Sequence, residues 1–261
     1  MSGRERIRSE GLCYTYLTRN GETIALKNLN LTVFDGEFCS VVGPSGCGKS
    51  TLLAIISGLL QPTEGRTLLD GTHIRGTNER VGIILQKDHL FEWRTVLQNA
   101  ELGLEILGKA SAQARRQVHM LLELYGLGGF ENSYPYQLSG GMRQRVALVR
   151  TLATNPDILL LDEPFSALDY QTKLILERDV HRIIRDNRKT ALLITHDIEE
   201  AVSMSDRIIV LSGRPAQVKS IYEVALTVEG ERTPMNSRDA PEFRTYCKSI
   251  WEDLDIERRA L

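Results

Sequence analysis

The chain has few of the features that mark secreted, metal-binding or membrane-spanning proteins. Its 261 residues include four cysteines, and their spacing matches no metal site. No positively charged leader with an apolar segment precedes them, so we expect a reducing cytosol and no secretion. The longest apolar runs, such as TLLAIISGLL, span ten residues or fewer, whereas a helix that crosses a bilayer needs about 20.

The chain also carries almost no net charge. Its formal charge is −2, which gives no global field to recruit nucleic acid or an anionic membrane. Hydrophobic residues make up 42% of the chain and charged residues 25%, as in an ordinary globular protein. We therefore expect no nucleic-acid partner, and either one large domain or a core with an inserted subdomain.

Short apolar runs alternate with helix-length segments, a pattern that predicts an α/β fold with a largely parallel sheet. The strands are expected at residues 38–43, 81–86, 158–163, 191–196 and 207–212. Ligands bind at the carboxyl ends of parallel strands. The residues expected at those ends are Gly43, Gln86, Asp162, Glu163 and His196. Between residues 88 and 155 the strand pattern disappears, which indicates an inserted helical subdomain.

A phosphate-binding motif, GPSGCGKST, follows the first buried strand and precedes a helix. In that context the backbone N–H groups of the loop can surround phosphate oxygens, while Lys49 supplies charge and Ser50 a Mg²⁺ ligand. The alternative is a glycine turn that merely enters a helix. The predicted nucleotide contacts of this loop are Gly43, Pro44, Ser45, Gly46, Cys47, Gly48, Lys49, Ser50 and Thr51.

The segment ILLLDEP, residues 158–164, ends a buried strand with two adjacent carboxylates. Alone, the pair could be a solvated strand end. Beside a bound triphosphate, Asp162 is suited to Mg²⁺, directly or through water. Glu163 lies where Pro164 ends strand pairing, so it can turn toward the attacking water and act as the general base.

Two glycines begin a helix in LSGGMRQR, residues 138–145. Ser139 is a favourable N-cap, and the missing side chains at Gly140 and Gly141 let an anion approach the helix N-terminus closely. The simpler alternative is an N-capped helix without a ligand. Together with the phosphate loop, this motif predicts a second phosphate-binding end.

These motifs, with SALD (166–169) and TH (195–196), occur in the order and spacing of ATP-binding cassette (ABC) transporter ATPases, which the chain resembles over residues 7–215. The resemblance implies a P-loop NTPase (RecA-like) core, an N-terminal antiparallel β-subdomain and a helical subdomain at about 88–155. It implies an ATPase domain at 1–225, a helical tail at 226–261, and ATP with Mg²⁺ as cofactors.

The resemblance further implies a head-to-tail dimer of two copies, in which Ser139, Gly140 and Gly141 of one close over ATP held by Lys49 of the other. It assigns Gln86 as a Mg²⁺ ligand and sensor, and His196 as the γ-phosphate switch. Asp169 becomes a dimer-interface residue. Tyr16 is assigned to adenine stacking, although Tyr14 is a second candidate two residues away.

The segment KDHLFEWRTVLQNAELGLEILG resembles importer ATPases of the nitrate, sulfonate and taurine group. Its aromatic residues Phe91 and Trp93 then face a membrane permease; burial of Trp93 in the helical subdomain is the alternative. The tail supports the same group, because Phe243, Tyr246, Ile250 and Leu254 form a helical stripe. The resemblance implies an ATP-hydrolysing importer subunit, peripheral on the cytoplasmic face of the membrane, with an extracytoplasmic solute-binding protein as an indirect partner.

Other functions remain open at this stage. A soluble ABC ATPase would normally show tandem cassettes or long coiled-coil or basic insertions, and a small-molecule phosphotransferase would lack the LSGG helix. Within the importers, the solute pocket belongs to the permease and the binding protein, so this sequence leaves the solute open.

Overall fold

The computed structural model describes residues 3–18, 21–166 and 168–255. It divides into two compact units, one made of Met1–Asn78 with Leu174–Leu261 and the other of Glu79–Lys173. The boundary at residues 173 and 174 falls inside helix α5 (Tyr170–Asp186). No helix among the described residues is both long enough and apolar enough to span a bilayer.

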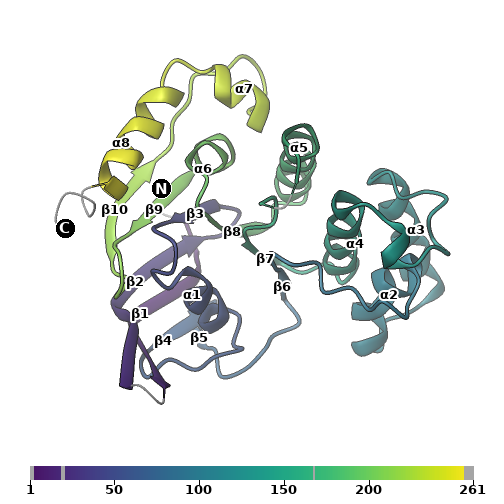
Figure 1. Ribbon diagram of the computed structural model, residues 1–261, viewed down its shortest axis with the longest axis horizontal. Helices are drawn as coiled ribbons and strands as arrows, with labels where there is room; N and C mark the ends of the chain where they lie inside the picture. The colour runs from purple at the N-terminus through teal and green to yellow at the C-terminus, as the bar shows by residue number, and fades with distance from the viewer. Residues whose placement is uncertain (1–2, 19–20, 167, 256–261) are drawn as a thin grey trace. The chain divides into compact units, whose positions relative to one another are not determined.

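The first unit contains an antiparallel sheet that begins near the N-terminus (Figure 1). Its strand order is β2-β1-β4-β5. The strands are β1 (Glu5–Thr18), β2 (Gly21–Phe34), β4 (Glu64–Leu69) and β5 (Thr72–His73).

The same unit holds four strands of a mixed sheet, in the order β10-β9-β3-β8. Strand β3 is parallel to β8 and β9, and β10 is antiparallel to β9. All five residues of β3 are buried, as expected for a parallel strand covered on both faces. These strands are β3 (Phe38–Val42), β8 (Thr190–Thr195), β9 (Arg207–Leu211) and β10 (Val218–Glu223), with helices α1 (Lys49–Ile56) and α6 (Ile198–Met204).

The second unit pairs two parallel strands and packs α2 and α3 against α4 (Figure 1). Its elements are β6 (Val81–Ile84), α2 (Val96–Ile106), α3 (Ala112–Leu124), a short 3₁₀ helix (Pro135–Gln137), α4 (Gly140–Ala153) and β7 (Ile158–Asp162). The predicted α/β fold, with a mostly parallel sheet, an antiparallel N-terminal sheet and inserted helices, is confirmed. Strands β6 and β7 end one or two residues earlier than expected, which leaves Gln86 and Glu163 just beyond them.

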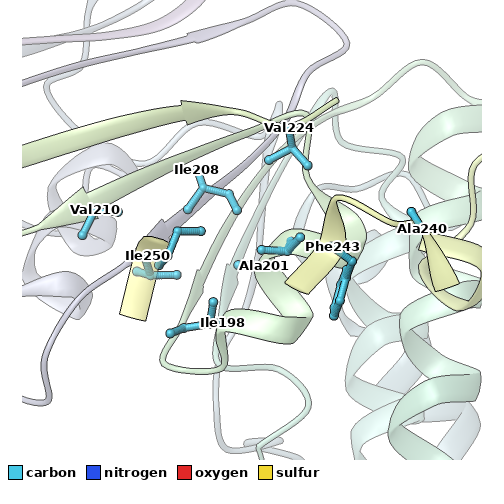
Figure 2. Close-up of a cluster of buried hydrophobic side chains, with 10 residues drawn as sticks. Ile198, Ala201, Ile208, Val210, Val224, Ala240, Phe243 and Ile250 are labelled. Atoms are coloured by element: carbon cyan, nitrogen blue, oxygen red, sulfur yellow. The ribbon is translucent and has the colours of Figure 1, made fainter. Parts of the chain in front are cut away.

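The tail forms two helices, α7 (Pro234–Asp239) and α8 (Phe243–Asp255). Phe243 and Ile250 of α8 are buried in a cluster with Ile198 and Ala201 of α6 and Ile208 of β9 (Figure 2). The expected stripe is therefore a packing face, and its other two members are partly buried against the same cluster. The tail belongs to the core of the first unit, while residues 256–261 lie outside the described part of the chain; the domain boundaries at 1–225 and 226–261 stay a prediction.

Candidate functional site

The side chain of Lys49 folds back onto the start of the phosphate loop. It is buried at the first position of α1. Its Nζ donates hydrogen bonds to the carbonyl oxygens of Gly43, at 2.8 Å, and Pro44, at 2.9 Å. The ammonium charge thus stays beside the backbone that precedes the helix, where it can contribute to binding an anion.

Gly48 is required by the conformation and packing of the loop. Its φ is 128°, a value that side chains disfavour, and a Cβ there would lie 2.9 Å from the carbonyl oxygen of Ala25 and 3.0 Å from Leu26. Strand β2 therefore lies directly against the loop. This contact explains why the turn into α1 needs glycine at residue 48.

Tyr16 of β1 reaches the same loop. Its hydroxyl lies 3.0 Å from Oγ1 of Thr51, within hydrogen-bonding distance. The ring is partly exposed and packs edge-to-face on Tyr14, with 4.8 Å between the ring centroids. Of the two candidate aromatic residues, Tyr16 is the one that contacts the loop through its hydroxyl, which favours its predicted assignment to adenine stacking.

His196 follows the strand that pairs with β3. Val42 and Thr195 are register partners in parallel strands, so Gly43 and His196 leave the sheet at the same edge. Thr195 Oγ1 accepts a hydrogen bond from the N–H of Asp197 at 3.0 Å, and Asp197 caps α6 through the N–H of Glu200 at 3.0 Å. The backbone on the C-terminal side of the exposed His196 is thus fixed, and the predicted switch residue lies at the same edge as the phosphate loop.

In the second unit, β6 and β7 bring Gln86 and Glu163 together. Gln86 Nε2 donates a hydrogen bond to Glu163 Oε2 at 3.3 Å, and it lies 3.4 Å from Ser166 Oγ. Glu163 has a φ of 46°, in the left-handed region that residues with side chains rarely adopt. Such strain concentrates at functional positions. Asp162 is the last residue of β7, and Glu163 follows it directly, one residue beyond the end of the strand.

Ser139 caps α4, and the two glycines that follow it differ in their surroundings. Ser139 Oγ accepts a hydrogen bond from the N–H of Met142 at 3.3 Å. A Cβ at Gly141 would lie 3.1 Å from Thr172, so packing within the unit favours a glycine there. A Cβ at Gly140 would meet nothing within 4 Å. Packing among the residues that the structure describes does not explain Gly140, which fits the prediction that an external anion approaches the helix start.

The candidate metal ligands are a hydroxyl, an amide and a carboxylate. No group of three or more His, Cys, Asp or Glu side chains that could hold a metal ion occurs among residues 3–18, 21–166 and 168–255. A site dominated by protein carboxylates is therefore not present in that part of the chain. Ser50, Gln86 and Asp162 each offer a hard oxygen donor of the kind that Mg²⁺ prefers, and their grouping around one ion stays a prediction.

The aromatic segment, residues 88–95, is held by Asn99 of α2. The sequence analysis did not predict this contact. The buried Asn99 accepts a hydrogen bond from the N–H of Phe91 at 2.8 Å, and its two Nδ2 hydrogens are shared among three backbone carbonyl oxygens of the segment at 3.0–3.1 Å. Phe91 is half-buried, and its ring stacks on Trp93 with 4.8 Å between centroids. Trp93 is 73% exposed, so its predicted alternative, burial in the helical subdomain, is wrong.

Two arginines of α4 bind the same segment. Arg143 donates to the carboxylate of Asp88 at 2.8 and 3.3 Å and to Glu92 at 2.7 Å. Arg150 donates to the carbonyl oxygens of Asp88 and His89, both at 2.7 Å. Burial would raise the pKa of Asp88, but the hydrogen bonds from Arg143 and the N–H of Leu90 outweigh it and lower the pKa. Asp88 thus stays ionised and bound to α4.

Comparison with known proteins agrees with this geometry. Residues 26–166 match the ABC transporter family. The chain is 44% identical to YtlC, an ABC transporter ATP-binding protein of Bacillus subtilis, over 93% of each chain. It is 42% identical to the taurine import ATP-binding protein TauB of Pelagibacter ubique, over 94% of this chain and 96% of the relative. It is 41% identical to the nitrate import ATP-binding protein NrtD of Synechocystis sp., over 90% of each.

A solved structure shares the fold. The ATP-binding cassette MJ0796, in a dimeric post-hydrolysis state bound to ADP and Pi, matches with a TM-score of 0.75 and 35% identity. The match covers 84% of this chain and 99% of that chain. The resemblance predicted from the ordered motifs is confirmed.

Proposed function

Since the chain belongs to the ABC transporter family and is an ATPase of that family, we propose that it energises an importer for a small anion such as nitrate, a sulfonate or taurine. The named relatives TauB and NrtD support this substrate class, because they serve taurine and nitrate import. An importer for a different solute is the alternative, and a soluble ABC ATPase without a permease is a second.

In this proposal each unit supplies part of the hydrolytic chemistry. Residues 43–51 hold the phosphates and Tyr16 stacks on adenine. Ser50, Gln86 and Asp162 would hold a Mg²⁺ ion, which would supply positive charge to the phosphate oxygens. Glu163 takes a proton from water as the water oxygen attacks the γ-phosphorus, and the bond to the leaving β-phosphate oxygen breaks. His196 contacts the γ-phosphate.

The proposal includes a head-to-tail dimer. Ser139, Gly140 and Gly141 of one copy close over the nucleotide of the other, with Asp169 near the interface. The space around Gly140 among the described residues of the second unit supports this arrangement, because a contact from outside the chain explains a glycine that their packing does not require. The dimeric state of the cassette MJ0796 supports it as well.

One observation carries the importer proposal: a large aromatic side chain is exposed on a segment that the protein holds rigid. Trp93 is 73% exposed, and burying an indole ring in a partner is among the strongest contributions a single residue makes to an interface. Its segment is fixed by Asn99, Arg143 and Arg150, so little conformational entropy is lost on docking. We assign this surface to a membrane permease, which places the subunit on the cytoplasmic face of the membrane with a solute-binding protein beyond it.

The test pairs Trp93→Ala with a control at Trp251, which is 59% exposed on α8. Trp93→Ala should reduce copurification of the permease and uptake of labelled solute by about tenfold or more, as expected for losing 2 kcal/mol of binding. ATP binding by the free subunit should stay unchanged. Trp251→Ala should leave assembly and uptake intact. Normal assembly of a Phe91→Ala/Trp93→Ala double variant would refute the docking surface.

A second test identifies the solute in cells that carry the gene for this chain. Deleting the gene should abolish uptake of one labelled solute among nitrate, taurine and an alkanesulfonate, and expressing the wild-type chain should restore that uptake. Loss of a permease-dependent uptake outside this class would instead support the alternative importer. If the chain shows its full cellular activity without any associated membrane protein, the soluble ATPase alternative would be supported.

A further inference from the structure

Arg214 makes a contact with the phosphate loop that none of the sequence motifs predicts. The residue follows β9, and its guanidinium donates two hydrogen bonds to one acceptor, the carbonyl oxygen of Gly46. The Nη2 donor lies at 2.7 Å and the Nε donor at 3.1 Å. Hydrogen bonds from charged donors are about twice as strong as neutral ones.

The contact fixes one end of a peptide group whose other end is also held. The peptide between Gly46 and Cys47 has its carbonyl bound by Arg214, and its N–H donates to the carbonyl oxygen of Pro44 at 3.3 Å. Gly46 has a φ of 72° and no Cβ, so by itself it rotates more freely than other residues. Arg214 and Pro44 together oppose rotation of this peptide.

The orientation of this peptide matters because of what the loop binds. Phosphate loops attract anions through N–H groups that point inward, and a carbonyl oxygen that pointed inward would repel a phosphate. Holding the Gly46 oxygen on the guanidinium keeps that dipole from turning. The positive charge of Arg214 also lies beside the loop.

Arg214 is exposed, but its backbone is anchored on both sides. The N–H of Ser212 donates to the carbonyl oxygen of Gln217 at 2.9 Å, and the N–H of Gln217 donates to Ser212 Oγ at 2.9 Å. The buried Ala216 pairs with β2, donating to Ala25 at 2.8 Å and accepting from Lys27 at 3.1 Å. The turn that carries Arg214 is therefore pinned to the strand that lies against Gly48.

We propose that Arg214 is a positioning residue that orients the Gly46–Cys47 peptide for phosphate binding. This inference rests on the proposed role of residues 43–51 as the phosphate loop. It predicts that Arg214 affects affinity for the phosphates and not for the nucleoside. It also predicts that a hydrogen bond, in addition to charge, is required.

The experiment measures displacement of a fluorescent ATP analogue from the full chain by ATP and by adenosine. Arg214→Met keeps the apolar stem and removes the donors. We expect the Kd for ATP to rise about three- to tenfold, because the lost hydrogen bond is charged but its contribution is reduced by solvent exposure. Affinity for adenosine should not change. Arg214→Lys, with one charged donor group in place of the fork, should recover part of the loss. Arg66→Met, which removes another exposed arginine in the same unit, should have no effect.

Three results would overturn the inference. One is an unchanged Kd for ATP in Arg214→Met. Another is an equal loss of adenosine binding. A third is full recovery by Arg214→Lys combined with disappearance of the effect in high salt, which would indicate long-range charge alone. Lys49→Ala separates the two proposals: if it binds ATP normally, the phosphate-loop assignment fails, whereas if it loses ATP and Arg214→Met does not, only the role of Arg214 fails.

Discussion

His181 should make the first unit lose stability in mild acid. The side chain is buried on α5, and its Nε2 accepts a hydrogen bond from Nε of Arg185 at 3.4 Å. Burial and, to a smaller extent, the nearby charges of Arg185 and Arg232 lower the pKa of His181 to about 4, while Asp206 opposes them. The Phe38 ring lies 5.9 Å away, centroid to centroid. The imidazole is therefore neutral in the folded protein near pH 7.

The direction and size of the effect follow from proton binding. In the unfolded chain His181 takes up a proton near pH 6.5, but in the folded chain only near pH 4. The stabilising contribution is thus complete above pH 6.5 and is lost as the pH falls toward 4. The full difference amounts to about 3 kcal/mol, of which about 2 kcal/mol is lost between pH 8 and pH 5.

The assay is urea unfolding at pH 8 and pH 5, followed by the fluorescence of Trp251 in a Trp93→Phe background, so that the signal comes from the unit that holds His181. His181→Gln cannot titrate, so its free energy of unfolding should fall by about 2 kcal/mol less than that of the parent over this interval. His119→Gln, at an exposed position on α3, serves as the control and should behave like the parent. Equal losses in His181→Gln and the parent would refute the reasoning.

Three further predictions concern the nucleotide site, the dimer and the tail. Glu163→Gln should slow hydrolysis by about 10²- to 10⁴-fold while preserving ATP binding. In that background, mixed dimers of Lys49→Ala and Ser139→Phe subunits should occlude up to one ATP per dimer, and neither parent almost any; no occlusion in verified hybrids would defeat action across the interface. Arg238→Met should destabilise the chain by about 3–5 kcal/mol in urea unfolding, because it leaves the fully buried Glu177 without its 2.7 Å ion pair. The double variant Arg238→Met/Glu177→Met should recover most of that loss, and failure to recover would contradict the ion-pair explanation.

The fold followed from the sequence where local patterns were strong. Buried parallel strands are continuous apolar runs in the sequence, so strands β3 and β8 were predictable, with Gly43 after the first and His196 after the second. The contacts of Lys49 are local as well, since the donor and its acceptors lie within six residues of each other. Ser139 was predictable as an N-cap because capping depends on neighbouring residues. The exact strand ends were not, since pairing with neighbours decides them.

Contacts between segments that lie far apart in the sequence could not be predicted from it. Arg214 and Gly46 are 168 positions apart, and no motif links them. Asn99 gave no signal either, because an asparagine in a helix reads as a neutral residue until its carbonyl and N–H partners are placed around it. The contact of the Tyr16 hydroxyl with Thr51 could not be predicted either, because strand alternation places Tyr14 and Tyr16 on the same face, and the choice between them for adenine stacking stays a prediction. Ala167 of the SALD motif lies outside the described residues.

Helix α4 connects the aromatic segment with Ser139, the residue that caps the helix N-terminus. Arg143 and Arg150 attach it to the aromatic segment at points seven residues apart, or about 10 Å along the helix axis. Both arginines bind Asp88, and Arg143 also binds Glu92, next to Trp93. We therefore expect a displacement of Trp93 to move Ser139, at the start of the same helix, with little bending between them.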